Sequence, residues 1–283
     1  MAWCARRIFT VLGSLLVLLL LIVSVARHPA SLGSGLFIMD IALLSGYAVL
    51  SIWGSRQRRP EVRVALTAGT QTGMMLGLIL ISSHVVEWFG LDRNRAAQFA
   101  RGAGSTLLML GLLAAAGSAA WERTRSIKLG VIGGLWCGSL GMMILLGFAL
   151  TLNLAFEAHA VAWLHEAFDA SGMHDPGAFV VRNSLKAASE ILIRMPIAAL
   201  GMSLIGSLLN WCITRSKTLA VLAAWITPPA LVAGAAALWH ADSLERAARP
   251  PFVLTGVLIA GIALCSVHPI WSGLHRRRNA GQR

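Results

Sequence analysis

The sequence predicts an all-α membrane protein, a polytopic bundle of about eight transmembrane helices. Of its 283 residues, 57% are hydrophobic and 13% are charged, a composition outside the range of soluble globular proteins. A helix needs about 20 mostly apolar residues to cross a hydrocarbon core of about 30 Å. Apolar segments that meet or approach this length lie at 8–26, 36–54, 64–86, 104–121, 129–153, 195–213, 218–239 and 252–271. The chain is therefore interpreted as one integral membrane domain, residues 1–283.

The formal net charge of +12 has a topological explanation. With eight spans, both termini and every second turn lie on one side of the membrane. Fifteen of the 24 Lys and Arg residues fall on that side, with only Glu61 and Glu122 of the twelve carboxylates. Basic residues in short turns stay cytoplasmic. We therefore predict an integral protein of a bacterial inner membrane with both termini in the cytoplasm, a lipid environment and no nucleic-acid partner.

The first apolar segment has two interpretations. Arg6 and Arg7 precede a long apolar run that ends at Ser24-Val25-Ala26, which also fits a signal peptide cleaved after Ala26. The run is longer than a usual signal-peptide core, so an uncleaved first span is favoured.

The second segment contains Asp40, the one carboxylate inside a predicted span. A carboxylate in a span needs a partner or a water-filled space. If segments 36–54 and 64–86 pack as an antiparallel hairpin, Ser83 and His84 lie near the depth of Asp40. The sequence thus suggests Asp40, Ser83 and His84 as an entry site for an ion or a proton, with a static hydrogen bond to Asp40 as the alternative.

Two of the segments carry glycines at every fourth position, which places them on one helix face. Such stripes allow another helix backbone to approach closely. They predict helix packing at Gly69, Gly73, Gly77, Gly130, Gly134 and Gly138.

An internal repeat relates residues 93–153 to 182–240. Arg93-Asn94 matches Arg182-Asn183, and Lys128 and Trp136 match Lys217 and Trp225. Each copy has the order of an outer turn, an inward span, a basic turn and an outward span, which predicts a parallel repeat of helical hairpins. A third, weaker copy aligns 63–73 with 128–138. The second copy differs by a predicted helix break at Pro228 and Pro229.

The long polar segment 155–194 is expected on the outer face. Its first part has the pattern of an amphipathic helix lying in the membrane interface, and a second helix is expected from Ser184, capped by Asn183. His165 and Asp169 are four residues apart, in a pattern that falls short of HExxH. With His159 they are candidate ligands of one divalent metal, against the alternative of a solvated helix face.

These features favour a permease or channel-like protein for a small solute or ion. One alternative is a non-catalytic subunit or assembly factor of a larger membrane complex, with other membrane subunits as partners. The second is a membrane enzyme with an outer-face metal site. The sequence contains no motif of a known soluble enzyme and identifies no cofactor, so an enzyme is the less favoured class.

Overall fold

A computed structural model describes residues 2–33, 36–90 and 95–215. In this part of the chain the structure is 93% helical, with no strands, which confirms the predicted all-α class. The helices are α1 (Ala2–Arg27), the short 3-10 helix η1 (Pro29–Gly33), α2 (Leu36–Arg56), α3 (Pro60–Trp88), α4 (Arg95–Thr124), α5 (Ile127–Ala155), α6 (Glu157–Trp163), α7 (His165–Ser171) and α8 (Pro176–Arg215).

Five of these helices are long and apolar enough to cross a membrane: α2, α3, α4, α5 and α8. α1 also contains an apolar stretch, Gly13–Arg27. Each of the first six predicted spans lies within one helix. The segments 218–239 and 252–271 lie outside the described residues, as do Pro228 and Pro229.

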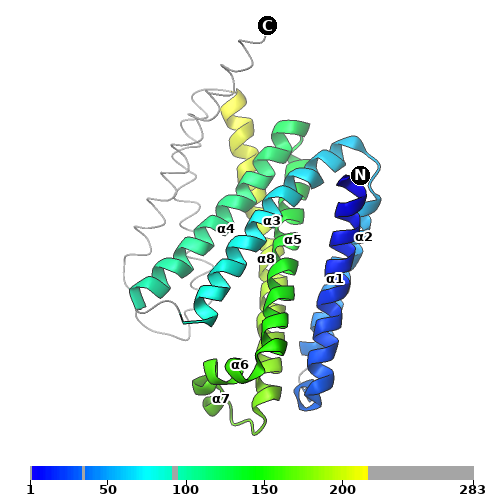
Figure 1. The fold of residues 1–283 in the computed structure, drawn as a ribbon. Helices are drawn as coiled ribbons and strands as arrows, with labels where there is room; N and C mark the ends of the chain where they lie inside the picture. The colour runs from blue at the N-terminus through cyan, green and yellow to red at the C-terminus, as the bar shows by residue number, and fades with distance from the viewer. Residues whose placement is uncertain (1, 34–35, 91–94, 216–283) are drawn as a thin grey trace.

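The long helices run roughly parallel and antiparallel to one another, with α5 and α8 at the centre (Figure 1). α3 packs mainly against α5, and α4 packs against α8 and α3. α1 and α2 stand together beside this group (Figure 1). α6 and α7 lie at one end of the bundle, which we call the α6/α7 end; the turns after Arg56 and Thr124 lie at the opposite end.

The glycine stripes lie where helix backbones meet. A Cβ atom at Gly73 would stand 2.9 Å from the carbonyl oxygen of Cys137, and one at Gly69 would overlap the carbonyl of Gly133. The second stripe meets α8: a Cβ at Gly138 would stand 2.9 Å from the Cβ of Ala199, and one at Gly134 would overlap Ser203. The missing side chains let α5 contact α3 and α8 at backbone distance.

The segment 155–194 differs from the expected two helices. α6 and α7 are separate helices of seven residues each, and the expected second helix is the first half of the 40-residue helix α8. Asn183 lies inside α8 and is not its cap. Asp175 takes that role, because its Oδ1 accepts from the N–H of Ala178 at 3.1 Å, and Pro176 in the first turn has no N–H to leave unpaired.

Candidate functional site

Asp40 is completely buried between α2 and α8, with 0% of its surface exposed. The hydroxyl of Ser189 on α8 donates to Asp40 Oδ1 at 2.5 Å. Asp40 Oδ2 is also buried, and it has no hydrogen-bond partner. A buried carboxyl with one free oxygen among apolar helices has the chemistry to take up a proton or a small cation.

A second polar contact joins the same two helices. Pro196 lies inside α8 and has no N–H to donate to the carbonyl of Leu192, four residues earlier. The hydroxyl of Tyr47 on α2 donates to this carbonyl at 3.0 Å. Tyr47 is seven residues from Asp40, so both lie on one face of α2. Two buried hydrogen bonds therefore join α2 and α8. One is accepted by the carboxyl group of Asp40, and the other by the carbonyl that Pro196 leaves without its helical donor.

The structure does not bring Ser83 and His84 to Asp40. Ser83 accepts from Arg101 Nη1, at 3.2 Å both at its carbonyl and at its hydroxyl oxygen. The ring of His84 lies 5.9 Å from that of Trp88. The expected hairpin does not form. After the turn at 57–59, α3 runs away from α2, and α2 packs against α1 and α8 instead (Figure 1).

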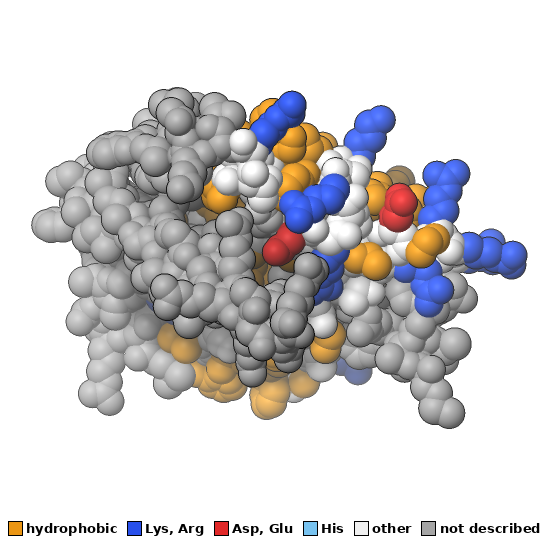
Figure 2. All heavy atoms as spheres, turned by 90° about the horizontal axis from the view of Figure 1, so that it is seen from above, with side chains coloured by type: hydrophobic (Ala, Val, Ile, Leu, Met, Phe, Trp, Pro, Cys, Tyr) orange, Lys and Arg blue, Asp and Glu red, His pale blue; other side chains and the backbone are white. Residues whose placement is uncertain are grey.

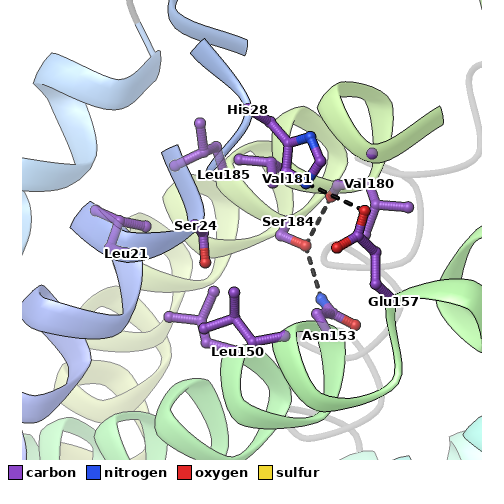
Figure 3. A pocket seen from close by; sticks show the side chains of 12 residues that line it. Leu21, Ser24, His28, Leu150, Asn153, Glu157, Val180, Val181, Ser184 and Leu185 are labelled. Atoms are coloured by element: carbon purple, nitrogen blue, oxygen red, sulfur yellow. Dashed lines mark hydrogen bonds and ion pairs between the residues drawn. The ribbon is translucent and has the colours of Figure 1, made fainter. Parts of the chain in front are cut away.

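A small cavity lies between the ends of α1, α5 and α8 at the α6/α7 end. The space open to the centres of water molecules is about 20 Å³, enough for about one water molecule. Ser24, Asn153 and Ser184 turn toward it (Figure 3). Asn153 Nδ2 donates to Ser184 Oγ at 2.8 Å, and Ser184 Oγ donates to the carbonyl of Val180 at 2.8 Å.

His28 and Glu157 close the edge of this cavity (Figure 3). His28 Nε2 lies 3.1 Å from Glu157 Oε1, and His28 Nδ1 lies 4.0 Å from Asp175 Oδ2. Gly177 makes this approach possible, because a Cβ atom there would stand 2.6 Å from His28 Nδ1 and 2.8 Å from Glu157 Oε1. Three chain corners, after α1, after α5 and before α8, therefore meet at one histidine.

The suggested metal ligands are not gathered into a site. His159 Nε2 lies 3.0 Å from the carbonyl of Trp88, within a cluster that also contains Phe89 and Trp163. His165 Nδ1 lies 3.0 Å from the carbonyl of Ala162. Within residues 2–33, 36–90 and 95–215, no three His, Cys, Asp or Glu side chains are placed to hold a metal ion.

Sequence reasoning missed Ser189 and Tyr47, and it placed His28 on the outer side without pairing it with Glu157. Two signals were present: Tyr47 is the one tyrosine of the chain, and Pro196 falls inside an apolar segment. Neither signal identifies the residue that is contacted, because the hydrogen bonds between α2 and α8 join residues 145 and 149 positions apart. Comparisons of the chain with protein-family models, with curated proteins and with solved structures found no match.

Proposed function

We propose that this chain is an integral membrane protein of the permease or channel class, and that Asp40 binds a proton or a monovalent cation as a small solute or ion crosses. The observation that carries the proposal is the burial of Asp40, with Oδ2 unpartnered, between α2 and α8. An ionisable side chain within a span is costly to keep and marks ion and proton pathways.

The irregularity in α8 supports the same site. Membrane transporters often have discontinuous helices at their binding sites; α8 is continuous, and Pro196 gives it a point at which it can bend. Pro196 lies seven residues beyond Ser189, the hydrogen-bond partner of Asp40, and therefore two turns along the same helix face. The helix can bend there at low cost, because the carbonyl that Pro196 leaves unpaired already has Tyr47 as its donor.

The parallel repeat is part of the proposal. The same pattern, Trp-x-x-Thr-Arg, occurs at the end of α8, at 211–215, and at the end of α4 with the residue that follows it, at 121–125. Arg125 lies over the ring of Trp121 at 5.0 Å, and Arg215 lies over that of Trp211 at 5.1 Å. The two helices touch where Ser207 Oγ donates to the carbonyl of Gly117 at 3.2 Å, residues 90 positions apart. This is the offset between the two patterns, one residue more than the offset between Lys128 and Lys217, and it supports copies related by an axis between α4 and α8.

The second hairpin of that repeat would continue beyond α8. Lys217 and Trp225, the predicted counterparts of Lys128 and Trp136, lie outside the described residues. Trp136 itself lies within the bundle, where its Nε1 donates to Thr70 Oγ1 at 3.0 Å.

The charge distribution supports the proposed orientation. The end opposite α6 and α7 carries exposed basic side chains at Arg56, Arg58, Arg59, Arg123, Arg125, Lys128 and Arg215. Figure 2 views this end and shows Lys and Arg side chains standing out from it. By the positive-inside rule this end is cytoplasmic, which places the α6/α7 end and its small cavity outside.

Infrared spectroscopy of the purified chain in lipid nanodiscs tests the role of Asp40. The band that Asp40→Asn removes from the carboxyl region identifies this side chain. We expect it to change with pH, for a proton site, or with Na⁺ at constant pH, for a cation site. A band that responds to neither contradicts the proposal. Glu166→Gln is the matched control, since Glu166 is exposed on α7.

A non-catalytic subunit of a membrane complex is the second candidate. It is favoured by α2, which packs on α1 and α8 among the described helices and leaves large apolar side chains exposed at Ile38, Val49 and Trp53. Purification from native membranes in a mild detergent separates the two: a partner recovered in fixed stoichiometry, and lost on Val49→Arg, supports the subunit.

A further inference from the structure

We propose that protons reach Asp40 from the α6/α7 end, through the cavity between α1, α5 and α8, and that His28 and Glu157 form its mouth. The inference rests on the proposed function, and it adds a route and the identity of the bound species. It follows from the position of the cavity along α8, from its size and from the groups that close it.

Along α8, the cavity lies about one turn closer to the N-terminus of the helix than Ser189, the partner of Asp40. Ser184 and Leu185 line it, and Ser189 is four residues beyond Leu185. Residues four apart on a helix lie on one face, about 6 Å apart along the axis. Leu185 is completely buried, at 0% exposure, and belongs to the same apolar cluster as Leu21 and Leu44. In the proposed route its side chain is the barrier between the cavity and Asp40.

The size of the cavity selects the species that can pass. About 20 Å³ of space for water centres accommodates about one water molecule and no organic solute. A water molecule needs two to four polar partners. Asn153 Oδ1 accepts no hydrogen bond from the described residues, and Ser24 Oγ and Ser184 Oγ each keep a lone pair after their helical bonds. A water held by these atoms can relay a proton.

The mouth supplies groups that exchange protons with the outside water. Glu157 is partly exposed and lies 3.1 Å from His28 Nε2, with Asp175 as the other charged side chain facing the ring. The relay is balanced: one proton passes from Glu157 or His28 to the cavity water, which gives one of its own protons to Asp40 Oδ2. The donor at the mouth is then reprotonated from outside. For the transfer to Asp40, Leu185 must rotate and water must enter the space that it leaves, because the cavity and the Asp40–Ser189 pair are about one helical turn apart.

Hydrogen–deuterium exchange of the Asp40 carboxyl tests this route. The full chain in nanodiscs is transferred to D₂O at a pH where the Asp40 band is present, and the shift of that band is followed in time. Leu185→Ala removes the barrier and should speed exchange at least about tenfold, as expected when a barrier falls by ~1.4 kcal/mol. Ser184→Val removes a polar atom from the relay and should slow it by a similar factor.

Leu146→Ala is the matched control. Leu146 is buried in the same cluster as Leu185 but does not line the cavity, so its truncation should leave the exchange rate within about twofold of wild type, a shift of ~0.4 kcal/mol. Equal acceleration by both leucine variants, or no effect of Ser184→Val in a folded protein, overturns the route and leaves Asp40 as the proton site. An Asp40 band that responds to Na⁺ at constant pH and not to pH overturns the assignment of the proton. A band that responds to neither overturns the proposed function as well.

Discussion

The hydroxyl of Tyr47 donates a hydrogen bond of 3.0 Å to the main-chain carbonyl of Leu192. This is the carbonyl that would accept from residue 196 in a regular helix, and residue 196 is a proline. A side chain of α2 thus completes the hydrogen bonding of α8. Within a membrane such a bond replaces an unsatisfied carbonyl, which explains why a proline is tolerated in the middle of a 40-residue helix.

This relationship predicts a coupling between Tyr47 and Pro196. Tyr47→Phe should lower the free energy of unfolding in mixed micelles by about 0.6 kcal/mol and by no more than about 1.7 kcal/mol, the average and the maximum for hydrogen bonds between membrane helices. In a Pro196→Ala background the new N–H can donate to Leu192, so the loss caused by Tyr47→Phe should be smaller. Equal losses of unfolding free energy in both backgrounds would show that the Tyr47 hydroxyl does not compensate for the N–H that Pro196 lacks.

The helix contacts at glycine give a second prediction. Gly69→Ala places a methyl group against the backbone carbonyl of Gly133, which cannot move aside, and should destabilise the protein by about 1–3 kcal/mol. Gly46→Ala is the control, because a Cβ there meets nothing within 4 Å and Ala stabilises a helix by roughly 1 kcal/mol over Gly. In thermal unfolding in detergent, the Tm should fall for Gly69→Ala and rise for Gly46→Ala.

The contact between Trp136 and Thr70 gives a third. Thr70→Val keeps the shape of the side chain but leaves the buried Trp136 Nε1 without its acceptor, with an expected loss of about 1 kcal/mol of unfolding free energy. Thr151→Val is matched to it, since Thr151 Oγ1 bonds to the carbonyl four residues earlier, as Thr70 Oγ1 does, and has no further partner among the described residues. An equally large loss of unfolding free energy for Thr151→Val would show that the effect comes from the bond to the carbonyl four residues earlier and not from the bond with Trp136.

The proposed orientation predicts which side of the membrane each turn faces. In a background without the four native cysteines, Cys introduced at Ser171 should react with an impermeant maleimide added outside intact cells. Cys introduced at Gln57, in the turn between α2 and α3, should react only after permeabilisation. Reaction of both positions from the same side would reject the topology and, with it, the entry of protons from the α6/α7 end.

Much of the fold follows from sequence because apolar length and turn residues act locally. The first six apolar segments and the turns at 57–59 and 125–126 correspond to elements of the structure. The boundary of α8 was less predictable. Asn183 and Asp175 are both good capping residues, and the choice between them depended on Pro176 and on the apolar contacts of Phe179 and Val180.

The candidate site was only half predictable. Asp40 stands out because a carboxylate in an apolar segment needs an explanation. The partner of Asp40 cannot be recognised in the same way. The local sequence pattern is compatible with α2 packing along α3 and also with α2 packing elsewhere. The structure places α2 against α8, so Ser189 replaces Ser83 and His84 beside Asp40. The partners of His28 were equally hidden, since its carboxylate neighbours lie more than 120 residues further along the chain.

Proton flux through proteoliposomes tests the central claim most directly. The full chain is reconstituted with a pH-sensitive dye inside, a negative interior potential is imposed with K⁺ and valinomycin, and acidification is recorded with and without external Na⁺. Wild type and Glu166→Gln should acidify the interior at similar rates. The acidification rate of Asp40→Asn should be at least about tenfold lower, close to that of protein-free vesicles. Flux in Asp40→Asn equal to wild type, or wild-type flux no faster than protein-free vesicles, would contradict the account.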